Sequence, residues 1–486
     1  MGPQPMGDLM IFLPGVMGSV LAKDGNVLWG ISPKILPRLL QFEQFVRDLS
    51  LAGDDPDRLA LDDGVVATAL MPDVHLIPGF WKIDGYTSLI DAISAQVGVT
   101  LGDVAAPQKK ANFFPFPYDW RRDNRANAKR LKRFIDKQLP AWQESSGNAS
   151  AKVILMAHSM GGLISRYYLE CLGGHAKCRA LLTFGTPYRG SLNALDSIIN
   201  GMHLFKSFFD VSPALRSFTS TYQLLPSYPV VDTGHGYADL TQTGRIGDLD
   251  PERARNAIKQ FIQPMEAAAR KRVKADQPLP YQSFLFIGTN QPTKESALLS
   301  AGVITPREEL PDLAQIRRFP GYGDNTVPFY SALPGGTRLR DHRISYASES
   351  HGSLQCNLYL QEQLIKTLQL LQASDDILGE ESFEAGIQPG LRLRISDAYP
   401  SEGGLIRVEP ADIEGDLGDL QITLAQLDAE APPTSRLVAP QDGAWVTELD
   451  RPAPGIYRVQ AEIITGPARF VRPVQDLFEV FPAPAA

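Results

Sequence analysis

The sequence predicts an α/β protein with a doubly wound, mostly parallel sheet, followed by an all-β sandwich. Up to about residue 378, short apolar strand-like segments alternate with longer helical stretches, as in parallel sheets. Beyond that point, short segments of alternating polarity are separated by Pro, Gly and Asp, a pattern typical of sandwiches. With 486 residues the chain is also too long for a single core. We therefore expect one domain over residues 1–378 and a second over 379–486.

Five apolar segments are the expected strands of the first domain: Leu9–Leu13, Val153–His158, Leu181–Gly185, Phe284–Gly288 and Arg343–Ala347. Because helical stretches separate these segments, the strands should lie parallel in one sheet. In such sheets the functional residues lie on loops at the carboxyl ends of the strands. Those loops are where we expect the chemistry of this protein.

The segment Val153–His158 turns abruptly at Ser159 into residues that favour a helix. Small residues, Ala157 and Gly161, stand two positions to either side of this serine, and Gly162 lets the helix pack close. A serine in a strained strand-to-helix turn requires such small neighbours. The pattern predicts a nucleophile elbow with an exposed hydroxyl. The alternative is a buried serine in an ordinary strand-to-helix turn.

A nucleophilic serine at an elbow needs a histidine base and an acid that orients it, in the chain order Ser, Asp or Glu, His. Two histidines follow the long insertion: His351 in a small polar loop after an expected strand, and His342 at the start of that strand. The loop favours His351 as the base and leaves His342 as a surface residue. Asp324 lies between glycines and a proline, which favours the acid over a plain turn aspartate. The predicted triad is Ser159, Asp324 and His351.

An oxyanion hole in this arrangement needs the backbone N–H of the residue after the nucleophile and a second N–H from a loop after an early strand. The first donor would be Met160. The first apolar run ends in Pro14 and Gly15, and its turn would aim the amide of Val16 at the serine. An ordinary strand-to-turn transition would look the same in the sequence.

Two stretches interrupt the strand pattern. The longer, about 191–280, begins with Leu192–Phe209, which is apolar enough for a lid helix facing a substrate pocket or a lipid surface. An internally packed cap helix fits this segment equally well. The shorter, about 29–60, has helically spaced apolar side chains between Pro37 and Leu51 that suit either a lid or core packing. The basic run Arg121–Arg133 is interpreted as a solvated helix face rather than a phosphate-binding patch.

The tail is acidic, since residues 381–486 hold 17 acidic and 8 basic residues, while the whole chain has a net charge of −8. This balance argues against a nucleic-acid partner and against electrostatic anchoring to anionic lipid. The tail contains no His or Cys, so docking, substrate presentation or stability suits it better than chemistry. We expect few contacts between it and the catalytic loops, so that residues 1–378 fold alone.

Three cysteines, Cys171, Cys178 and Cys356, are too few for a disulfide framework and lack metal-ligand spacing, so we expect reduced thiols and no metal or other cofactor. The first residues lack the charged and apolar segments of a signal peptide. No apolar run reaches the roughly 20 residues that a membrane helix needs. These features predict a cytoplasmic protein.

The chain resembles the lecithin:cholesterol acyltransferase family from residue 9 to about 360. Six short blocks stand in the family's order: Pro14–Ser19, Phe116–Arg121, Ala157–Gly161, Gly185–Ser191, Ser220–Pro226 and Gly323–Pro328. The resemblance implies an α/β-hydrolase core with a helical lid, acting on acyl esters of lipids as a phospholipase A and, in some members, transferring the acyl group to an alcohol. It implies the roles of nucleophile, acid, base and oxyanion donors for Ser159, Asp324, His351, Val16 and Met160. The side chains that we expect to face the substrate or the lid are Met17, Trp120, Leu204 and Phe205.

This sequence departs from the family pattern at three points. Ala157 stands where many relatives have glycine, which keeps a small side chain. Asn325 stands where glycine usually follows the acid, and asparagine tolerates a left-handed backbone. The early excursion lacks the cysteine pair of the secreted animal members, so their lid behaviour and acceptor preference do not carry over.

The favoured hypothesis is a serine hydrolase or O-acyltransferase that acts on lipid acyl esters through an acyl-enzyme on Ser159. The runner-up is a deacylase or esterase of a lipid-modified glycan or protein. A hydrolase-fold docking protein without catalysis is the alternative from another class. The partners to expect are a lipid or acyl-ester substrate, a membrane surface touched through the lid, and a protein bound by the sandwich. The choice of substrate rests on the resemblance, because one fold hosts many reactions.

Overall fold

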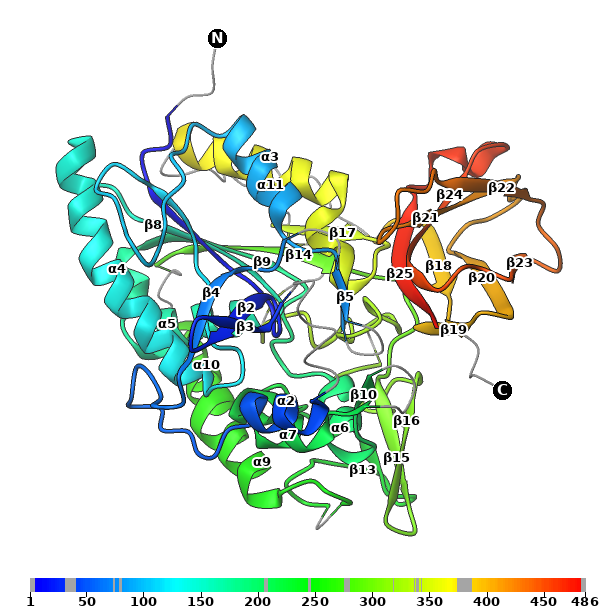
Figure 1. The fold of residues 1–486 in the computed structure, drawn as a ribbon, viewed down its shortest axis with the longest axis horizontal. Coiled ribbons are helices and arrows are strands. Elements are labelled where there is room, and N and C mark those ends of the chain that lie inside the picture. The colour runs from blue at the N-terminus through cyan, green and yellow to red at the C-terminus, as the bar shows by residue number, and fades with distance from the viewer. Residues whose placement is uncertain are drawn as a thin grey trace.

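The computed structural model describes residues 5–30, 41–72, 75–77, 81–204, 209–243, 246–274, 280–317, 319–335, 337, 341, 343–373 and 387–481. Its centre is a six-stranded sheet in the order β17, β14, β9, β8, β1, β7, in which every neighbouring pair is parallel (Figure 1). The strands are β1 (Leu9–Leu13), β7 (Phe113–Pro115), β8 (Val153–His158), β9 (Cys178–Phe184), β14 (Gln282–Gly288) and β17 (Ile344–Ala347). The chain builds outward from β1 in both directions, so the predicted doubly wound α/β-hydrolase class is confirmed.

The five strands expected for the main sheet are all present. Its sixth strand, β7, is not predicted from the sequence pattern. It has three residues and ends at Pro115, so it is too short to reveal a period. It pairs with β1 at the edge of the sheet, a position where proline is tolerated. Just beyond β7, the N–H of Phe116 donates to the carbonyl of Phe12 at 2.8 Å. This bond fixes the point at which the segment Phe116–Arg121 leaves the sheet.

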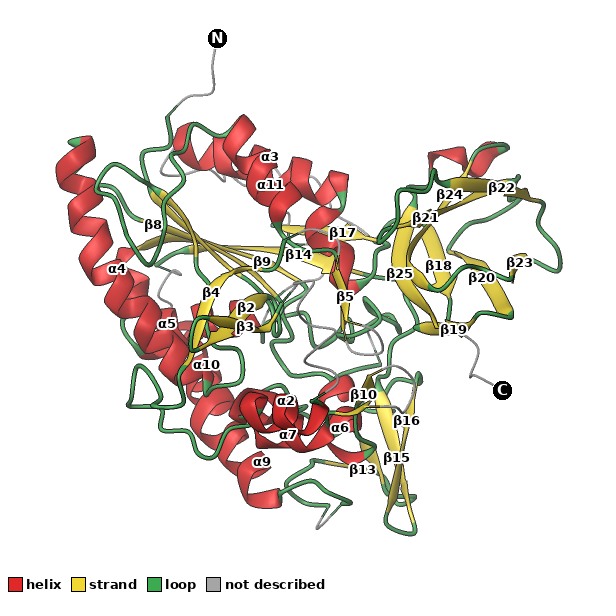
Figure 2. Cartoon of the chain, viewed as in Figure 1, coloured by secondary structure: helices red, strands yellow, loops and turns green. Residues whose placement is uncertain are grey.

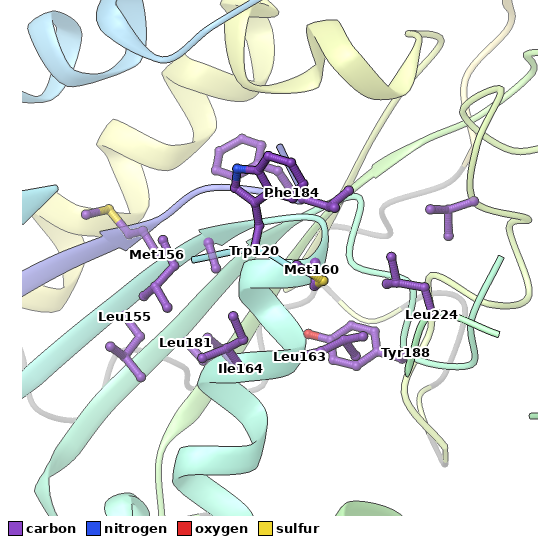
Figure 3. Packing of buried hydrophobic residues seen from close by; sticks show 14 of the residues in the cluster. Trp120, Leu155, Met156, Met160, Leu163, Ile164, Leu181, Phe184, Tyr188 and Leu224 are labelled. Carbon is purple, nitrogen blue, oxygen red and sulfur yellow. The ribbon is translucent and has the colours of Figure 1, made fainter. Parts of the chain in front are cut away.

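Helices cover both faces of this sheet (Figures 1 and 2). One face carries α3 (Thr87–Gln96) and α11 (Leu358–Ala373), and the other carries α4 (Asn124–Ser146), α5 (Met160–Cys171) and α10 (Gln263–Lys274). The expected apolar stripe of α4 is buried at Leu131, Ile135 and Leu139. Leu155 and Leu181, from neighbouring strands, belong to the same buried cluster as Ile164 of α5 (Figure 3). The helix that follows the elbow is therefore anchored in the centre of the core.

The interpretation of the basic run as a solvated helix face is wrong for Arg121 and Arg122, which precede α4 and are buried. The Arg121 side chain is fully buried and pairs with Asp119 and Asp63, each at 2.7 Å. Arg122 pairs with Asp54 at 3.1 Å, and both side chains are 4% exposed. The cause is an aspartate-rich loop over residues 54–63 that folds across the start of α4. The arginines anchor this early excursion through buried ion pairs.

The early excursion forms an antiparallel sheet of β2 (Ser19–Lys23), β3 (Asn26–Trp29) and β4 (Val65–Leu70), and a hairpin of β5 (His75–Ile77) and β6 (Trp81–Ile83). Between β3 and β4 lies α2 (Phe42–Leu49), which buries Phe45 and Leu49. The described part of the helix expected from Pro37 to Leu51 therefore packs internally. Residues 37–40 lie outside the described residues.

The long insertion begins with α6 (Leu192–Ile199), which is much shorter than the lid helix expected to reach residue 209. The expectation is wrong because Asn200 and Gly201 end the helix, with Gly201 at a φ of 81°. Four buried residues of α6, with Leu195 among them, face the core.

The remaining elements of the insertion are β10 (His203–Leu204), β11 (Phe209–Asp210), α7 (Ser212–Ser217), α8 (Thr219–Gln223), β12 (Val231–Asp232), β13 (Tyr237–Ala238), α9 (Pro251–Ala257) and a π-helical turn at Ile258–Ile262. After β14, the hairpin of β15 (Ser296–Ser300) and β16 (Val303–Arg307) joins β12.

The C-terminal part is a sandwich of two sheets with its own apolar core, as predicted. One sheet has the order β18 (Gly390–Arg394), β20 (Gly403–Ala411), β23 (Trp445–Asp450), and the other β19 (Ala398–Pro400), β25 (Val474–Phe481), β24 (Gly455–Ile463), β21 (Leu420–Gln426), β22 (Thr434–Val438). Trp445, Val459 and Phe478 are fully buried in a cluster separate from the main core. The boundary expected near residue 378 lies outside the described residues.

The expectation of few contacts between the sandwich and the catalytic loops is wrong. Side chains of Gln291 and Ser350, in loops of the first domain, hydrogen-bond to the backbone of Leu391 and Gln475 in the sandwich. Strand β25 also lies against β5, β6 and the 3-10 helix His351–Cys356. The edge of the sandwich is therefore joined to the carboxyl end of the main sheet.

Among the described residues, no helix is both long and apolar enough to span a bilayer.

Candidate active site

Ser159 lies in the turn between β8 and α5 with φ 52° and ψ −123°, a strained conformation for a residue with a side chain. A Cβ on Gly161 would lie 2.5 Å from the carbonyl oxygen of Pro14, and one on Gly162 would lie 2.0 Å from the Oγ1 of Thr186. Neither position can accept a larger residue without a shift of the backbone or of the facing loop. The local geometry is that of the expected nucleophile elbow.

Ser159, His351 and Asp324 form a continuous hydrogen-bonded chain. His351 Nε2 is 2.9 Å from Ser159 Oγ, and His351 Nδ1 is 2.7 Å from Asp324 Oδ2. All three residues are buried, with exposed fractions of 1–3%. With the Nδ1 proton donated to the carboxylate, Nε2 is left as an acceptor for the serine hydroxyl. Three residues far apart in the sequence thus meet at the carboxyl ends of β8, β14 and β17.

The Asp324 carboxylate is held by its own loop. Its Oδ1 accepts the backbone N–H groups of Thr326 at 3.1 Å and Val327 at 2.7 Å, and its carbonyl accepts the N–H of His351 at 2.7 Å. Asn325 has a φ of 74°, so asparagine takes the left-handed backbone that its position was expected to require. The acid is therefore fixed in direction before any substrate binds.

The turn expected to supply an oxyanion donor packs against the serine. A Cβ on Gly15 would lie 3.0 Å from the Cβ of Ser159, which places the turn at the end of β1 against the elbow. Among the hydrogen bonds of the described residues, none uses the N–H of Val16 or of Met160. The oxyanion-donor role of Val16 and Met160 stays a prediction.

A buried polar relay links this turn to the histidine loop. The N–H of Gly15 donates to the hydroxyl of Tyr86 at 2.8 Å, and this hydroxyl lies 2.9 Å from His158 Nδ1. His158 Nε2 in turn lies 3.0 Å from the carbonyl oxygen of His351. Burial lowers the pKa of His158 well below its usual value, and neighbouring His351 acts in the same direction. A neutral His158 accepts from Tyr86 at Nδ1 and donates from Nε2, which satisfies every group in the chain.

Replacing Tyr86 by phenylalanine should break this relay. The N–H of Gly15 and the Nδ1 of His158 would lose their partner in a buried place, at a cost of about 1–3 kcal/mol each in the free energy of unfolding. The turn carrying Val16 would also lose its anchor, so we expect kcat to fall, by less than the roughly 10²- to 10³-fold that losing an oxyanion donor costs. Thermal unfolding and ester hydrolysis measure the two effects.

Tyr168→Phe is the matched control, because the Tyr168 hydroxyl is also buried but makes no hydrogen bond to any described residue. Its removal should leave both stability and activity close to those of the wild type. Equal behaviour of the two variants would contradict the role assigned to the relay.

Of the four residues expected to face the substrate or the lid, Met17 and Trp120 have described side chains, and both are buried. Trp120 is fully buried, donates its indole N–H to the carbonyl of Ser19 at 3.0 Å and packs edge-on against Trp29 at 5.1 Å. Met17 is buried with a φ of 60° and its carbonyl accepts the indole N–H of Trp29 at 3.1 Å. Leu204 lies in β10, and its side chain is outside the described part of the structure. Phe205 and His342 lie outside the described residues as well.

Tyr86 and His158 are not predicted from the sequence. His158 stands next to the nucleophile, and its position within a fully buried strand is the signal that could have marked it as a satisfied polar residue. Tyr86 carries no such local signal. Within the described residues, no group of three or more His, Cys, Asp or Glu side chains could hold a metal ion.

The sheet order, the strained serine and the hydrogen-bonded Ser, His and Asp together define an α/β-hydrolase with a serine-type site. Residues 100–245 match the family model described as lecithin:cholesterol acyltransferase, so the resemblance expected from the sequence blocks is confirmed. The match supports hydrolysis or transfer of acyl groups on lipids as the general class of activity. A search of curated proteins found no match.

Two solved structures show weak similarity. The lipase BlEst2 of Bacillus licheniformis, in its propeptide form, is 12% identical, covers 98% of this chain and 94% of its own, and has a TM-score of 0.30. Phospholipase PlaB of Legionella pneumophila is 11% identical, covers 97% of this chain and 90% of its own, and has a TM-score of 0.21. At these TM-scores neither structure adds to the fold assignment, which rests on the strand order and the elbow.

Proposed function

We propose that this protein hydrolyses or transfers the acyl group of lipid esters through a covalent acyl-enzyme on Ser159. The observation that carries the proposal is the hydrogen-bonded chain from Asp324 through His351 to the strained serine. This is the constellation that acyl transfer requires: a nucleophile, a base, a group that orients the base, and donors for the oxyanion. The lipid class of the substrate comes from the family match over residues 100–245.

In the first half of the reaction, His351 Nε2 takes the hydroxyl proton as Ser159 Oγ attacks the ester carbonyl. The carbonyl oxygen becomes an oxyanion that accepts the N–H groups of Val16 and Met160. The tetrahedral intermediate then collapses, the bond to the leaving alcohol breaks, and the alcohol takes the proton from His351. The products of this half are the free alcohol and a serine ester.

In the second half, water or another alcohol attacks the serine ester while His351 accepts its proton. Collapse of the second intermediate returns that proton to Ser159 and releases a free acid or a new ester. Asp324 holds the imidazole in one tautomer and stabilises the imidazolium that forms twice in each cycle. Hydrolysis and transfer differ only in which acceptor reaches the acyl-enzyme.

The proposed lipid specificity is tested by giving the purified protein a panel of substrates: phospholipid vesicles, a neutral-lipid emulsion, and an acylated glycan or protein. Each is incubated with and without a long-chain alcohol, and products are identified by mass spectrometry. We expect a free fatty acid and lysophospholipid without the alcohol, and a new ester where transfer occurs.

The Ser159→Ala protein is the control for contaminating lipases in the same panel. Release of acyl groups from the acylated glycan or protein alone would favour a deacylase instead. No product from any member of the panel, with a folded protein, would contradict the proposed function.

A further inference from the structure

The C-terminal sandwich holds the two residues that lead into His351. The Oγ of Ser350 donates to the carbonyl of Gln475 in β25 at 3.0 Å, and the N–H of Gln475 donates to the Glu349 carboxyl at 3.2 Å. Ser350 and Glu349 are both buried. The side chains of the two residues just before the histidine thus hydrogen-bond to the sandwich.

The Glu349 carboxyl is buried at this contact with the sandwich. It also accepts the N–H of Ser350 at 3.0 Å and the side-chain amide of Asn357 at 3.1 Å. Burial raises its pKa to about 8, with the charge of nearby Asp476 acting in the same direction. Three N–H donors, from Ser350, Asn357 and Gln475, therefore set the geometry of this contact.

The sandwich also holds the loop of Asp324, through Gln291. The side-chain amide of Gln291 donates to the carbonyl of Leu391 at 2.9 Å and accepts the N–H of Leu393 at 3.1 Å, as a neighbouring strand would. The backbone of Gln291 meanwhile exchanges hydrogen bonds of 2.9 and 3.3 Å with Gly323, which directly precedes Asp324. Gln291 therefore links β18 to the loop of the acid: its side chain bonds to the strand, and its backbone bonds to Gly323.

Arg392 of β18 also contacts this loop. Its guanidinium lies 3.8 Å from the centroid of the Tyr322 ring, and its Nε donates to the carbonyl of Asn290 at 2.8 Å. Tyr322 has a φ of 71°, which is strained for an aromatic residue. Strained backbone persists only where the surroundings fix it, and here the sandwich provides part of that surrounding.

A third contact reaches the other side of His351. Arg458 of β24 forms an ion pair with Asp84, whose side chain is fully buried. The N–H of Asp84 donates to the carbonyl of Gly352 at 2.9 Å, immediately after the histidine. The base is therefore flanked on both sides by segments that depend on the sandwich.

We propose that the sandwich is a positioning part of the active site, because its strands hold the loops of Asp324 and His351 through Gln291, Arg392, Glu349 and Ser350. This inference rests on the acyl-transfer function proposed for Ser159. It replaces the view of the tail as a separate docking module. A misplacement of about 1 Å in a catalytic group can cost about 10²-fold in rate, so loosening these contacts should reduce catalysis without unfolding the protein.

The test uses the full chain with Arg392→Ala and Ser350→Ala. Arg407→Ala is the matched control, since this arginine of β20 pairs with Glu409 within the sandwich at 2.9 Å. Ser350→Thr restores the hydroxyl and should recover activity. Each protein is compared in kcat and KM on a short-chain nitrophenyl ester, in the rate of fluorophosphonate labelling of Ser159, and in hydrogen exchange of the peptide covering residues 348–356.

We expect Arg392→Ala and Ser350→Ala to lower kcat and the labelling rate by about 10- to 100-fold, with KM changed by no more than about twofold. Amides of residues 348–356 should exchange faster in Ser350→Ala than in the control. Should Arg392→Ala fail to fold, Arg392→Met keeps the apolar stem over Tyr322, removes the guanidinium and gives the same comparison.

Folded variants that are labelled and exchange at the rates of wild type and Arg407→Ala would overturn this inference alone. A wild-type protein that fluorophosphonate does not label would instead contradict the proposed function, and the inference with it. Loss of activity through KM, with kcat unchanged, would mean that the sandwich acts in substrate binding and would also overturn the positioning role.

Discussion

Ser159→Ala should lower kcat by about 10⁴- to 10⁶-fold and abolish labelling by a fluorophosphonate probe. In the proposed mechanism the serine Oγ carries the acyl group, so its removal leaves just the slow attack of water assisted by the remaining groups. The side chain is small, and alanine already stands two positions before it. Circular dichroism and thermal unfolding should therefore match wild type. Undiminished turnover in a folded Ser159→Ala protein would rule out the nucleophile.

His351→Ala should be nearly as damaging, because both proton transfers pass through this imidazole. Asp324→Asn should cost about 10⁴-fold or somewhat less. The amide would leave the imidazole in the wrong tautomer, with Nδ1 rather than Nε2 free to accept a proton. Single-turnover hydrolysis of a nitrophenyl ester separates these losses from substrate binding.

His342→Ala is the comparison for the histidine variant, since His342 is the other histidine that follows the long insertion. Its activity should remain close to that of wild type. A large loss at His342 together with a small loss at His351 would reverse the assignment of the base.

Much of the fold and the triad's placement can be predicted from the sequence because each part carries a local signal. Ser159 has small residues at fixed spacing, and Asp324 has glycines and a proline around it. The buried strands are apolar runs bounded by turns. The end of α6 also has a local signal, the pair Asn200 and Gly201, but an apolar run on both sides of that pair masks it.

The remainder of the site depends on contacts between distant segments. Tyr86 meets Gly15 and His158 across 71 and 72 residues, and Ser350 meets Gln475 across 125. No local period encodes a hydrogen bond of this kind, because its geometry exists only after the sheet and the sandwich have formed. The same reason explains Arg121, whose partner Asp63 precedes it by 58 residues and gives no sign in the sequence of folding back.

The position of β1 has a consequence for how the chain is made. Leu9–Leu13 is synthesised before either of the strands that flank it and is completely buried in the folded protein, with Met10 paired to Phe113 on one side and Leu9 paired to Val153 on the other. Neither neighbour exists until more than a hundred further residues have been synthesised, so this apolar strand waits unpaired during translation. Holdase chaperones that cover residues 9–13 during that interval should therefore govern the yield of folded enzyme, and slowing elongation between β1 and β8 should increase aggregation.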